Sequence, residues 1–136
     1  MCNKLTTRTF KTKKFSKQCH GIGITNDELC KSILEVMQGK ADDLGGGVYK
    51  KKLNKNMHRS IVLAKGGGYW FYEYIYAKSD RANIDSDELL VYRGIAKFYE
   101  AMHPATILKL IQMKDLVEIG DLFHGFVRGF AHSVKR

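Results

Sequence analysis

The residues best suited to chemistry are the basic side chains of three neighbouring segments. Lys50, Lys51 and Lys52 fall in VYKKKL, and Arg59 falls in the next segment, HRSIVLA. Alternate side chains of a strand share a face, so Lys50 and Lys52 point to one side and Lys51 points to the other. A third segment, YWFYEYIYAK, is followed by further cations. If the three segments are neighbouring strands, Lys50, Lys52, Arg59, Lys78 and Arg81 can converge on one patch.

A convergent cationic patch suits the cleavage of RNA by its own 2′-hydroxyl. That reaction needs a base, charge stabilisation on the phosphorane and a proton for the leaving oxygen. Repulsion within a lysine cluster favours a neutral amine that can act as the base, and the planar arginine fork can bind two phosphate oxygens. Nearby aromatic rings can stack on unpaired bases. The alternative, which the residues alone leave open, is a lysine-rich strand that faces water or blunts a sheet edge.

The charge of the whole chain also favours a polyanionic partner. Its 136 residues include 23 Lys and Arg against 14 Asp and Glu, for a net charge of +9. The excess lies in residues 1–20 and 50–81, which indicates a binding footprint. Nucleic acid is the leading candidate, although an acidic protein, an anionic membrane or two merely solvated faces also fit. The candidate RNA contacts are Lys13, Lys14, Lys51, Lys55, Tyr74 and Tyr76.

The elements that would position these residues can be predicted from local patterns. Thr9 to Lys13 is typical of a short strand. Thr25 begins a helix as the first residue of a capping box, and the three segments above form an antiparallel meander, with the glycines 66–68 in a hairpin turn. Helices begin at Asp85 or Ser86 and at Pro104. The predicted fold is α+β, a curved antiparallel sheet with helices packed on it.

No motif indicates a metal site or a cofactor. The five histidines are scattered, and neither glycine triplet is followed by the Lys-Ser or Lys-Thr of a phosphate loop. Three cysteines without ligand spacing are predicted to be free thiols in a reducing cytoplasm. The first residues contain no apolar stretch of the secretory kind, and no apolar run approaches the roughly 18 residues of a membrane helix. We therefore expect a cytoplasmic protein that needs no cofactor.

The stretch VYKKKLNKNMHRSIVLAK resembles the central strands of the RelE/ParE toxin superfamily, and is closest to its RelE-like, HigB-type branch. FKTKKFSK, ITNDELCKSILEVMQG, ADDLGGGVYKKKL, IYAKSDRANIDSDEL and KDLVEI resemble other parts of that branch, over roughly residues 8–119. DLGGGVYKK and AKSDRANI are the most specific of these pieces. The resemblance implies a toxin domain over residues 1–119 with the RelE-like fold, followed by a C-terminal extension over residues 120–136.

The resemblance also implies an activity. RelE-like toxins cut mRNA on the ribosome without a metal and are inhibited by a cognate antitoxin, which is often a helix-turn-helix protein in this branch. The family's Lys-x-Lys motif corresponds to Lys50 and Lys52, and its arginine corresponds to Arg59. Lys52 would be the base, Lys50 and Arg59 would stabilise the phosphate, and Lys78 or Arg81 would assist the leaving group.

The chain departs from the family pattern in one aromatic residue. RelE has a tyrosine near its C-terminus that stacks on the cut base, whereas AKSDRANIDSDEL contains none. Tyr74, Tyr76 and Tyr92 are the available substitutes. Two other functions remain to be weighed: a ParE-like toxin that acts on DNA gyrase without cutting RNA, and a degenerate toxin that only binds its antitoxin. The retained lysines and arginine favour cleavage.

Overall fold

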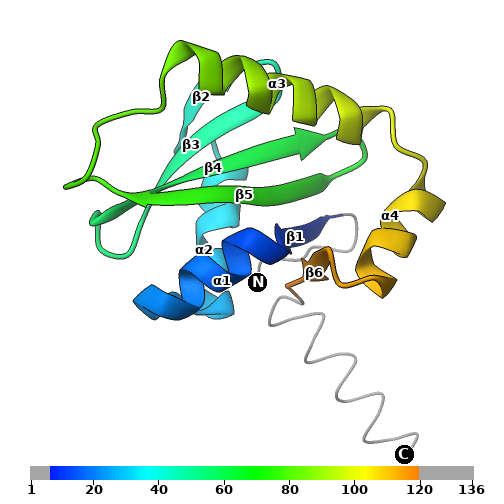
Figure 1. The fold of residues 1–136 in the computed structure, drawn as a ribbon, viewed down its shortest axis with the longest axis horizontal. Coiled ribbons are helices and arrows are strands. Elements are labelled where there is room, and N and C mark those ends of the chain that lie inside the picture. Colours follow the sequence, from blue (N-terminus) through cyan, green and yellow to red (C-terminus); the bar gives the residue numbers. More distant parts are fainter. Residues whose placement is uncertain (1–6, 120–136) are drawn as a thin grey trace, which may run out of the picture.

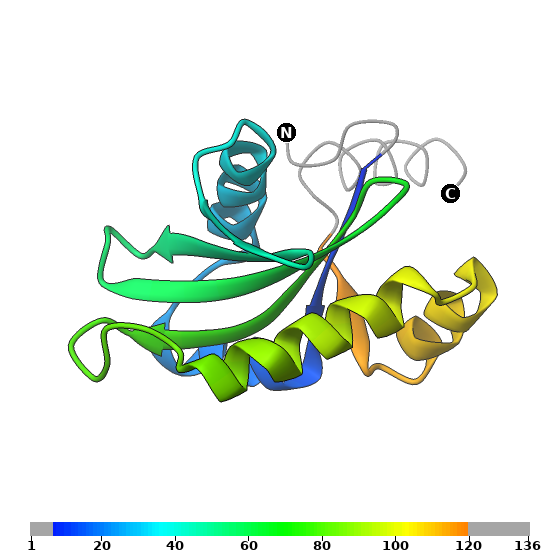
Figure 2. The ribbon, with the colours of Figure 1, turned by 90° about the horizontal axis from the view of Figure 1, so that it is seen from above.

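The protein folds around one mixed six-stranded sheet with two helices on each face (Figures 1 and 2). The computed structural model describes residues 7–119. The elements in chain order are β1 Arg8–Thr12, α1 Lys13–Ile22, α2 Asn26–Met37, β2 Asp42–Gly45, β3 Val48–Leu53, β4 His58–Lys65, β5 Tyr69–Ala77, α3 Ser86–Glu100, α4 Pro104–Gln112 and β6 Leu116–Glu118.

The strands lie in the order β2-β3-β4-β5-β1-β6. Neighbours are antiparallel except β1 and β5, which are parallel. The register of β1 on β5 pairs Lys11 with Tyr72, and no described pairing continues beyond that point. Residues 73–77 of β5 therefore have no strand on that side within the described part of the chain, and helix α1 lies there instead.

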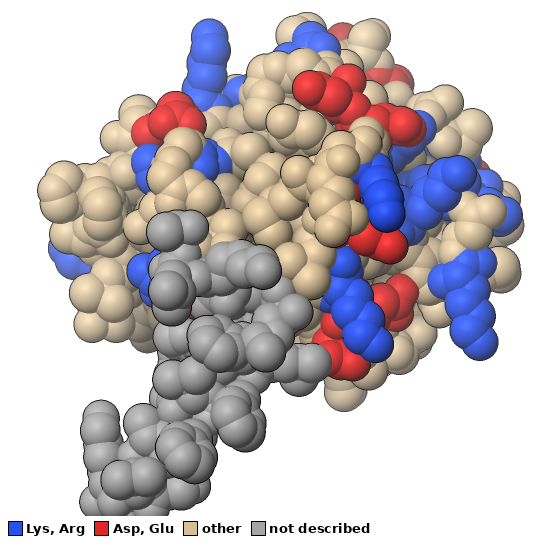
Figure 3. Space-filling view, turned by 180° about the vertical axis from the view of Figure 1, so that it is seen from behind, with Lys and Arg blue, Asp and Glu red and all other residues tan. Residues whose placement is uncertain are grey.

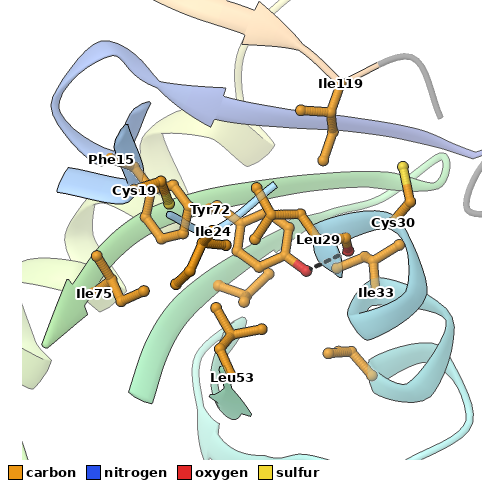
Figure 4. Close-up of a cluster of buried hydrophobic side chains, with 12 residues drawn as sticks. Phe15, Cys19, Ile24, Leu29, Cys30, Ile33, Leu53, Tyr72, Ile75 and Ile119 are labelled. Atoms are coloured by element: carbon orange, nitrogen blue, oxygen red, sulfur yellow. Dashed lines mark hydrogen bonds between the residues drawn. The ribbon is translucent and has the colours of Figure 1, made fainter. Parts of the chain in front are cut away.

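One face of the sheet is covered by α1 and α2. Thr25 caps α2 by accepting a hydrogen bond from the Glu28 backbone N–H at 3.2 Å, which starts a helix whose apolar residues face the sheet. Tyr72 is fully buried there, and its hydroxyl donates to the Leu29 carbonyl at 2.7 Å (Figure 4). A buried hydroxyl needs such a partner, so this bond fixes α2 against β5.

The other face is covered by α3 and α4. Asp85 and Glu88 form a complete capping box at the start of α3. Further along the helix, the rings of Tyr99 and Phe71 are parallel and their centroids are 3.9 Å apart. Pro104 occupies the first turn of α4. Helix α3 is therefore fixed at its N-terminus by its own cap and near its C-terminus by an aromatic stack on the sheet.

The predicted α+β class, the meander and the helices at residues 26–37, 86–100 and 104–112 are confirmed. The sheet is not antiparallel throughout, because β1 is parallel to β5. Helix α1 was not predicted, since the basic segment buries only Phe15 and Cys19, and its cap is Thr12, at the end of the preceding strand. The short strands β2 and β6 were not predicted either. β2 has only four residues and pairs with β3, the next strand in the chain, whereas β6 depends on pairing with the distant strand β1.

The expected free thiols are confirmed for Cys19, which is buried and free. The expectation is wrong for Cys30, which is disulfide-bonded. Within residues 7–119, no helix is long and apolar enough to span a bilayer. The predicted C-terminal extension, residues 120–136, lies outside the described residues.

Candidate active site

The register of the sheet places three side chains next to one another across the central strands. Lys52 on β3 is opposite Arg59 on β4, and Arg59 is opposite Tyr76 on β5. Directly paired residues project from the same face, and this is the face covered by α3, because Ile61 and Leu63, which alternate with Arg59, belong to the core beneath α3. Lys52 is exposed and makes no ion pair or side-chain hydrogen bond with residues 7–119.

Lys50 is held beside this row by two oxygen atoms. Its Nζ lies 2.6 Å from Asn83 Oδ1 and 3.6 Å from Asp42 Oδ2. Lys50, Lys51, Lys52 and Arg59 line an open hollow of about 290 Å³, whose opposite wall is residues 39–42. With Lys40 from that wall, five basic residues and the Asp42 carboxylate surround the hollow, an arrangement that can hold a phosphate.

Arg81 closes the row from the loop between β5 and α3. Its guanidinium forms a two-pronged ion pair with Glu88, and its Nε donates to the Asn83 carbonyl at 3.1 Å. Its Cζ lies 5.6 Å from the ring centre of Tyr76. The hydrogen bond with Glu88 raises the pKa of Arg81 above its usual value, so this group keeps its charge. We call Lys50, Lys52, Arg59 and Arg81 the basic row.

Lys78 is the other candidate for the role of Arg81, but no side-chain contact within residues 7–119 holds it at the basic row. It is exposed, and its side chain makes no hydrogen bond or ion pair within the described part of the chain. Its backbone N–H donates to Met57 at the base of the β3–β4 turn. The geometry therefore favours Arg81 as the fourth cation.

Lys51 lies on the opposite face, as the alternation of the strand predicts. It is 8% exposed, and its Nζ lies 2.6 Å from Glu35 Oε1 and 3.2 Å from the Lys40 carbonyl. The hydrogen bond from Lys51 lowers the pKa of Glu35. Lys51 therefore joins β3 to the end of α2. It also lines the hollow beside Lys50, Lys52 and Arg59, but its ammonium group is bound by Glu35.

We expect the substitution Lys51→Met to lower the free energy of unfolding by about 1 kcal/mol and leave any activity of the basic row intact, because Glu35 is half-exposed and solvent replaces much of the lost pair. The pair stabilises the fold at pH values above the pKa of the unfolded Glu35 carboxyl. This contribution is lost as the pH falls through the lower pKa that Glu35 has in the folded protein. Urea unfolding of Lys51→Met, Glu35→Gln and the double variant measures the coupling. If the loss of stability in the double variant equalled the sum of the losses in the two single variants, the pair would contribute nothing.

The remaining predicted RNA contacts lie around the row. Tyr74 is stacked between Tyr76 and Tyr92, with ring centres 5.7 Å and 6.2 Å away. Lys14 Nζ lies 5.3 Å from the Tyr74 ring centre, and Lys13 is exposed beside it at the start of α1. Lys55 is exposed in the β3–β4 turn. Lys and Arg side chains gather toward the right-hand margin of Figure 3, the side on which the β3–β4 turn lies.

Several residues of the site were not found from the sequence. Asp42, Asn83 and Glu88 hold the cations, but nothing in their types distinguishes them from surface residues. Glu73 was also missed. Its position is a bulge in β5: the register passes from Tyr72 opposite Val62 to Tyr74 opposite Ile61, which leaves Glu73 unpaired. A bulge redirects a side chain, and no residue pattern marked this one.

Burial raises the pKa of the Glu73 carboxyl from 4.5 to about 7, against the opposing effects of a hydrogen bond with Tyr99 and the charge of Lys14. Because the folded pKa is the higher one, the protonated carboxyl favours folding, and this contribution is lost as the pH rises through about 7. We expect wild type to lose about 3 kcal/mol of stability between pH 5 and pH 8.5 relative to Glu73→Gln. If the stability of wild type and of Glu73→Gln changed in parallel with pH, this prediction would be wrong. The control is Asp87→Asn, at an exposed position on α3, which should follow the wild-type profile.

The described residues contain no cluster of three or more His, Cys, Asp or Glu side chains that could hold a metal ion. In comparisons with known proteins, no curated protein and no solved structure matches the chain. One family model does match, that of the "RelE toxin of RelE / RelB toxin-antitoxin system", over residues 7–119. The match spans every strand and helix described above and the whole basic row. The chain therefore belongs to the RelE family of toxins, which act together with an antitoxin.

Proposed function

We propose that this toxin is a ribosome-dependent mRNA endonuclease that blocks translation. The observation that carries the proposal is the register that sets Lys52, Arg59 and Tyr76 side by side, with Lys50 and Arg81 adjoining them. Four cations beside an open hollow match the requirements of RNA cleavage by its own 2′-hydroxyl, in which negative charge develops on a phosphorane. Clustered guanidinium and ammonium groups supply that stabilisation without a metal ion.

The contacts of each cation suggest its role. Lys52 is unpaired within residues 7–119 and exposed, so no carboxylate of the protein holds it as an ammonium ion. In its neutral form its amine can accept the proton of the 2′-hydroxyl. Arg59 is its direct neighbour and Lys50 is held in place by Asn83, so both can bind non-bridging phosphate oxygens. Arg81 stays charged because of Glu88. It therefore assists the leaving 5′-oxygen by stabilising its negative charge, and that oxygen takes its proton from solvent water.

The proposed partners follow from the same reaction. The substrate is mRNA presented by the ribosome in the cytoplasm, and the activity is restrained by the cognate antitoxin. For a chain similar to the HigB-type branch, that antitoxin is proposed to be a helix-turn-helix protein. Tyr74, Tyr76, Lys13, Lys14 and Lys55 are proposed to contact RNA around the cut.

The proposal is tested by incubating the purified chain with ribosomes and a defined mRNA and mapping ends by primer extension. We expect discrete cuts that require ribosomes and that are absent with the variant Lys50→Ala/Lys52→Ala/Arg59→Ala. Cuts that persist with this variant would refute the assignment. If the message stays intact, a supercoiling assay with DNA gyrase tests the ParE-like alternative, and normal growth after induction would support a degenerate toxin.

Binding to RNA should also weaken with salt, because each phosphate contact releases counterions. For the four cations of the basic row, we expect log Kd against log salt concentration to change with a slope of about 2 to 3 for single-stranded RNA. Fluorescence anisotropy of a labelled oligonucleotide between 50 and 300 mM KCl gives the slope. A flat dependence would show that the row does not contact phosphates.

A further inference from the structure

We propose that a pocket over the bulge of β5 binds one unpaired nucleobase of the RNA, with the Glu73 carboxylate contacting a base edge that carries an amino group. This inference rests on the proposed function, since it concerns the same substrate. It adds a base-reading site next to the basic row and makes Glu73 a specificity-determining residue.

The pocket lies at the edge of β5, between the start of α1 and residues 88–95 of α3. Its volume is about 270 Å³, slightly below the range of sites for drug-sized ligands, so it suits a single ring system. The lining residues are Lys14, Glu73, Glu88, Val91, Tyr92 and Ile95. Two aliphatic side chains and one tyrosine form apolar walls, which is the composition that receives the flat face of a base.

Glu73 supplies the polar contact that this pocket needs. Its Oε1 is buried and has no hydrogen-bond partner among residues 7–119, although the carboxyl interacts with Tyr99. A buried acceptor left unpaired destabilises the folded protein, and a ligand that donates to it recovers part of this cost. The bulge explains the arrangement, because the extra residue projects out of the normal strand pairing.

Glu73 is fully a carboxylate only above its raised pKa of about 7, so the affinities are compared at pH 8.5. A carboxylate only accepts hydrogen bonds, so it favours an edge that presents donors. Guanine offers an adjacent ring N–H and amino group, and adenine and cytosine each offer an amino group. Uracil presents one N–H between two carbonyl oxygens, which the carboxylate repels. The expected order is therefore guanine first and uracil last.

The pocket is continuous with the basic row. Glu88 forms one wall of the pocket and binds Arg81 of the basic row. The Arg81 guanidinium lies over the ring of Tyr76. Tyr74 stacks with Tyr76 on one side and with Tyr92, another wall of the pocket, on the other. A strand whose phosphate lies at Lys52 and Arg59 can thus extend along tyrosine rings into the pocket.

The charges around the pocket favour RNA over a protein side chain as its occupant. Lys14 lies at one side of the pocket, with Lys13 and Lys17 on the same helix, and Arg81 lies behind the other side, where it is paired with Glu88. These cations attract the phosphates that accompany a base. They repel the basic peptide segment that would otherwise suit a carboxylate.

The test measures the affinity of the full chain for labelled single-stranded RNA octamers that differ at one central position, either uracil or guanine, in an otherwise uracil sequence. We expect wild type to bind the guanine octamer about 10-fold more tightly, within the range of a good base contact. Glu73→Gln should bring this ratio close to one, as should Val91→Trp, which fills the mouth of the pocket from an exposed position. Asp87→Asn, outside the pocket, should keep the wild-type ratio.

The outcomes separate this inference from the proposed function. A guanine preference that depends on Glu73 supports the inference, whether or not the chain cuts mRNA. A chain that cuts mRNA on the ribosome but binds both octamers equally overturns the inference alone. The inference is also wrong if Glu73→Gln and Val91→Trp both keep the wild-type ratio of guanine to uracil affinity. The same holds if Glu73→Gln binds both octamers like wild type and loses affinity only for the antitoxin.

Discussion

The substitution Lys52→Ala is expected to slow cleavage of ribosome-bound mRNA by at least about 100-fold under single-turnover conditions, the usual loss for a general base. The reason is that Lys52 is the exposed, unpaired amine of the basic row, whereas the other three cations are held by oxygen atoms of the protein. Affinity for RNA should change little, because one phosphate contact at most is lost. Rates measured with excess toxin separate the chemical step from binding.

Matched variants sharpen this prediction. Arg59→Lys keeps the charge but not the planar fork, so we expect an intermediate loss of roughly 10-fold, whereas Arg59→Ala should lose about as much as Lys52→Ala. Lys109→Ala, which removes an exposed cation from α4, is the control and should cleave at the wild-type rate. If Lys52→Ala and Lys109→Ala had equal rates, Lys52 would not be the base.

Replacing Phe71 with alanine is expected to lower the free energy of unfolding by about 3–5 kcal/mol. Phe71 is fully buried, and its ring lies parallel to that of Tyr99 with centres 3.9 Å apart. The substitution removes this stack and leaves a cavity between the sheet and α3. Since the free energy of unfolding of a domain is only about 5–15 kcal/mol, the midpoint of urea unfolding should move to a much lower urea concentration.

The control for this prediction is Phe98→Ala on the same helix. Phe98 is 69% exposed, so its removal should change the free energy of unfolding by less than about 0.5 kcal/mol. If Phe71→Ala cost no more than Phe98→Ala, the stack would not hold α3 to the sheet. Because α3 carries Glu88, the Phe71→Ala variant should also lose the fixed position of Arg81 in its folded fraction.

The parts of the site that could be predicted are those that depend on local pattern. Strand alternation alone places Lys50 and Lys52 on one face and Lys51 on the other, and the short turn before His58 brings Arg59 alongside. The capping residues Thr25 and Asp85 likewise fix where two helices begin. In each case the signal lies within a few residues of the feature it determines.

The remaining features depend on contacts between elements, which the pattern within one element does not determine. The choice of Arg81 over Lys78 follows from the ion pair with Glu88 on the next helix. The parallel position of β1 follows from its pairing with β5, 61 positions away at Arg8 and Tyr69. The orientation of Glu73 follows from a bulge in the pairing of β4 and β5. None of these pairings leaves a periodic trace in the sequence, so only the folded chain reveals them.

The most direct test of RNA cleavage by the basic row uses one mRNA in two forms, unmodified and with a single 2′-deoxynucleotide on the 5′ side of a mapped cut. Both are bound to ribosomes and incubated with the wild-type chain, and the ends are mapped by primer extension. The account predicts that the unmodified message is cut at that position and the modified message is not, while other positions are cut equally in both. Equal cutting at the modified position would contradict it, because the 2′-hydroxyl would then not be the nucleophile.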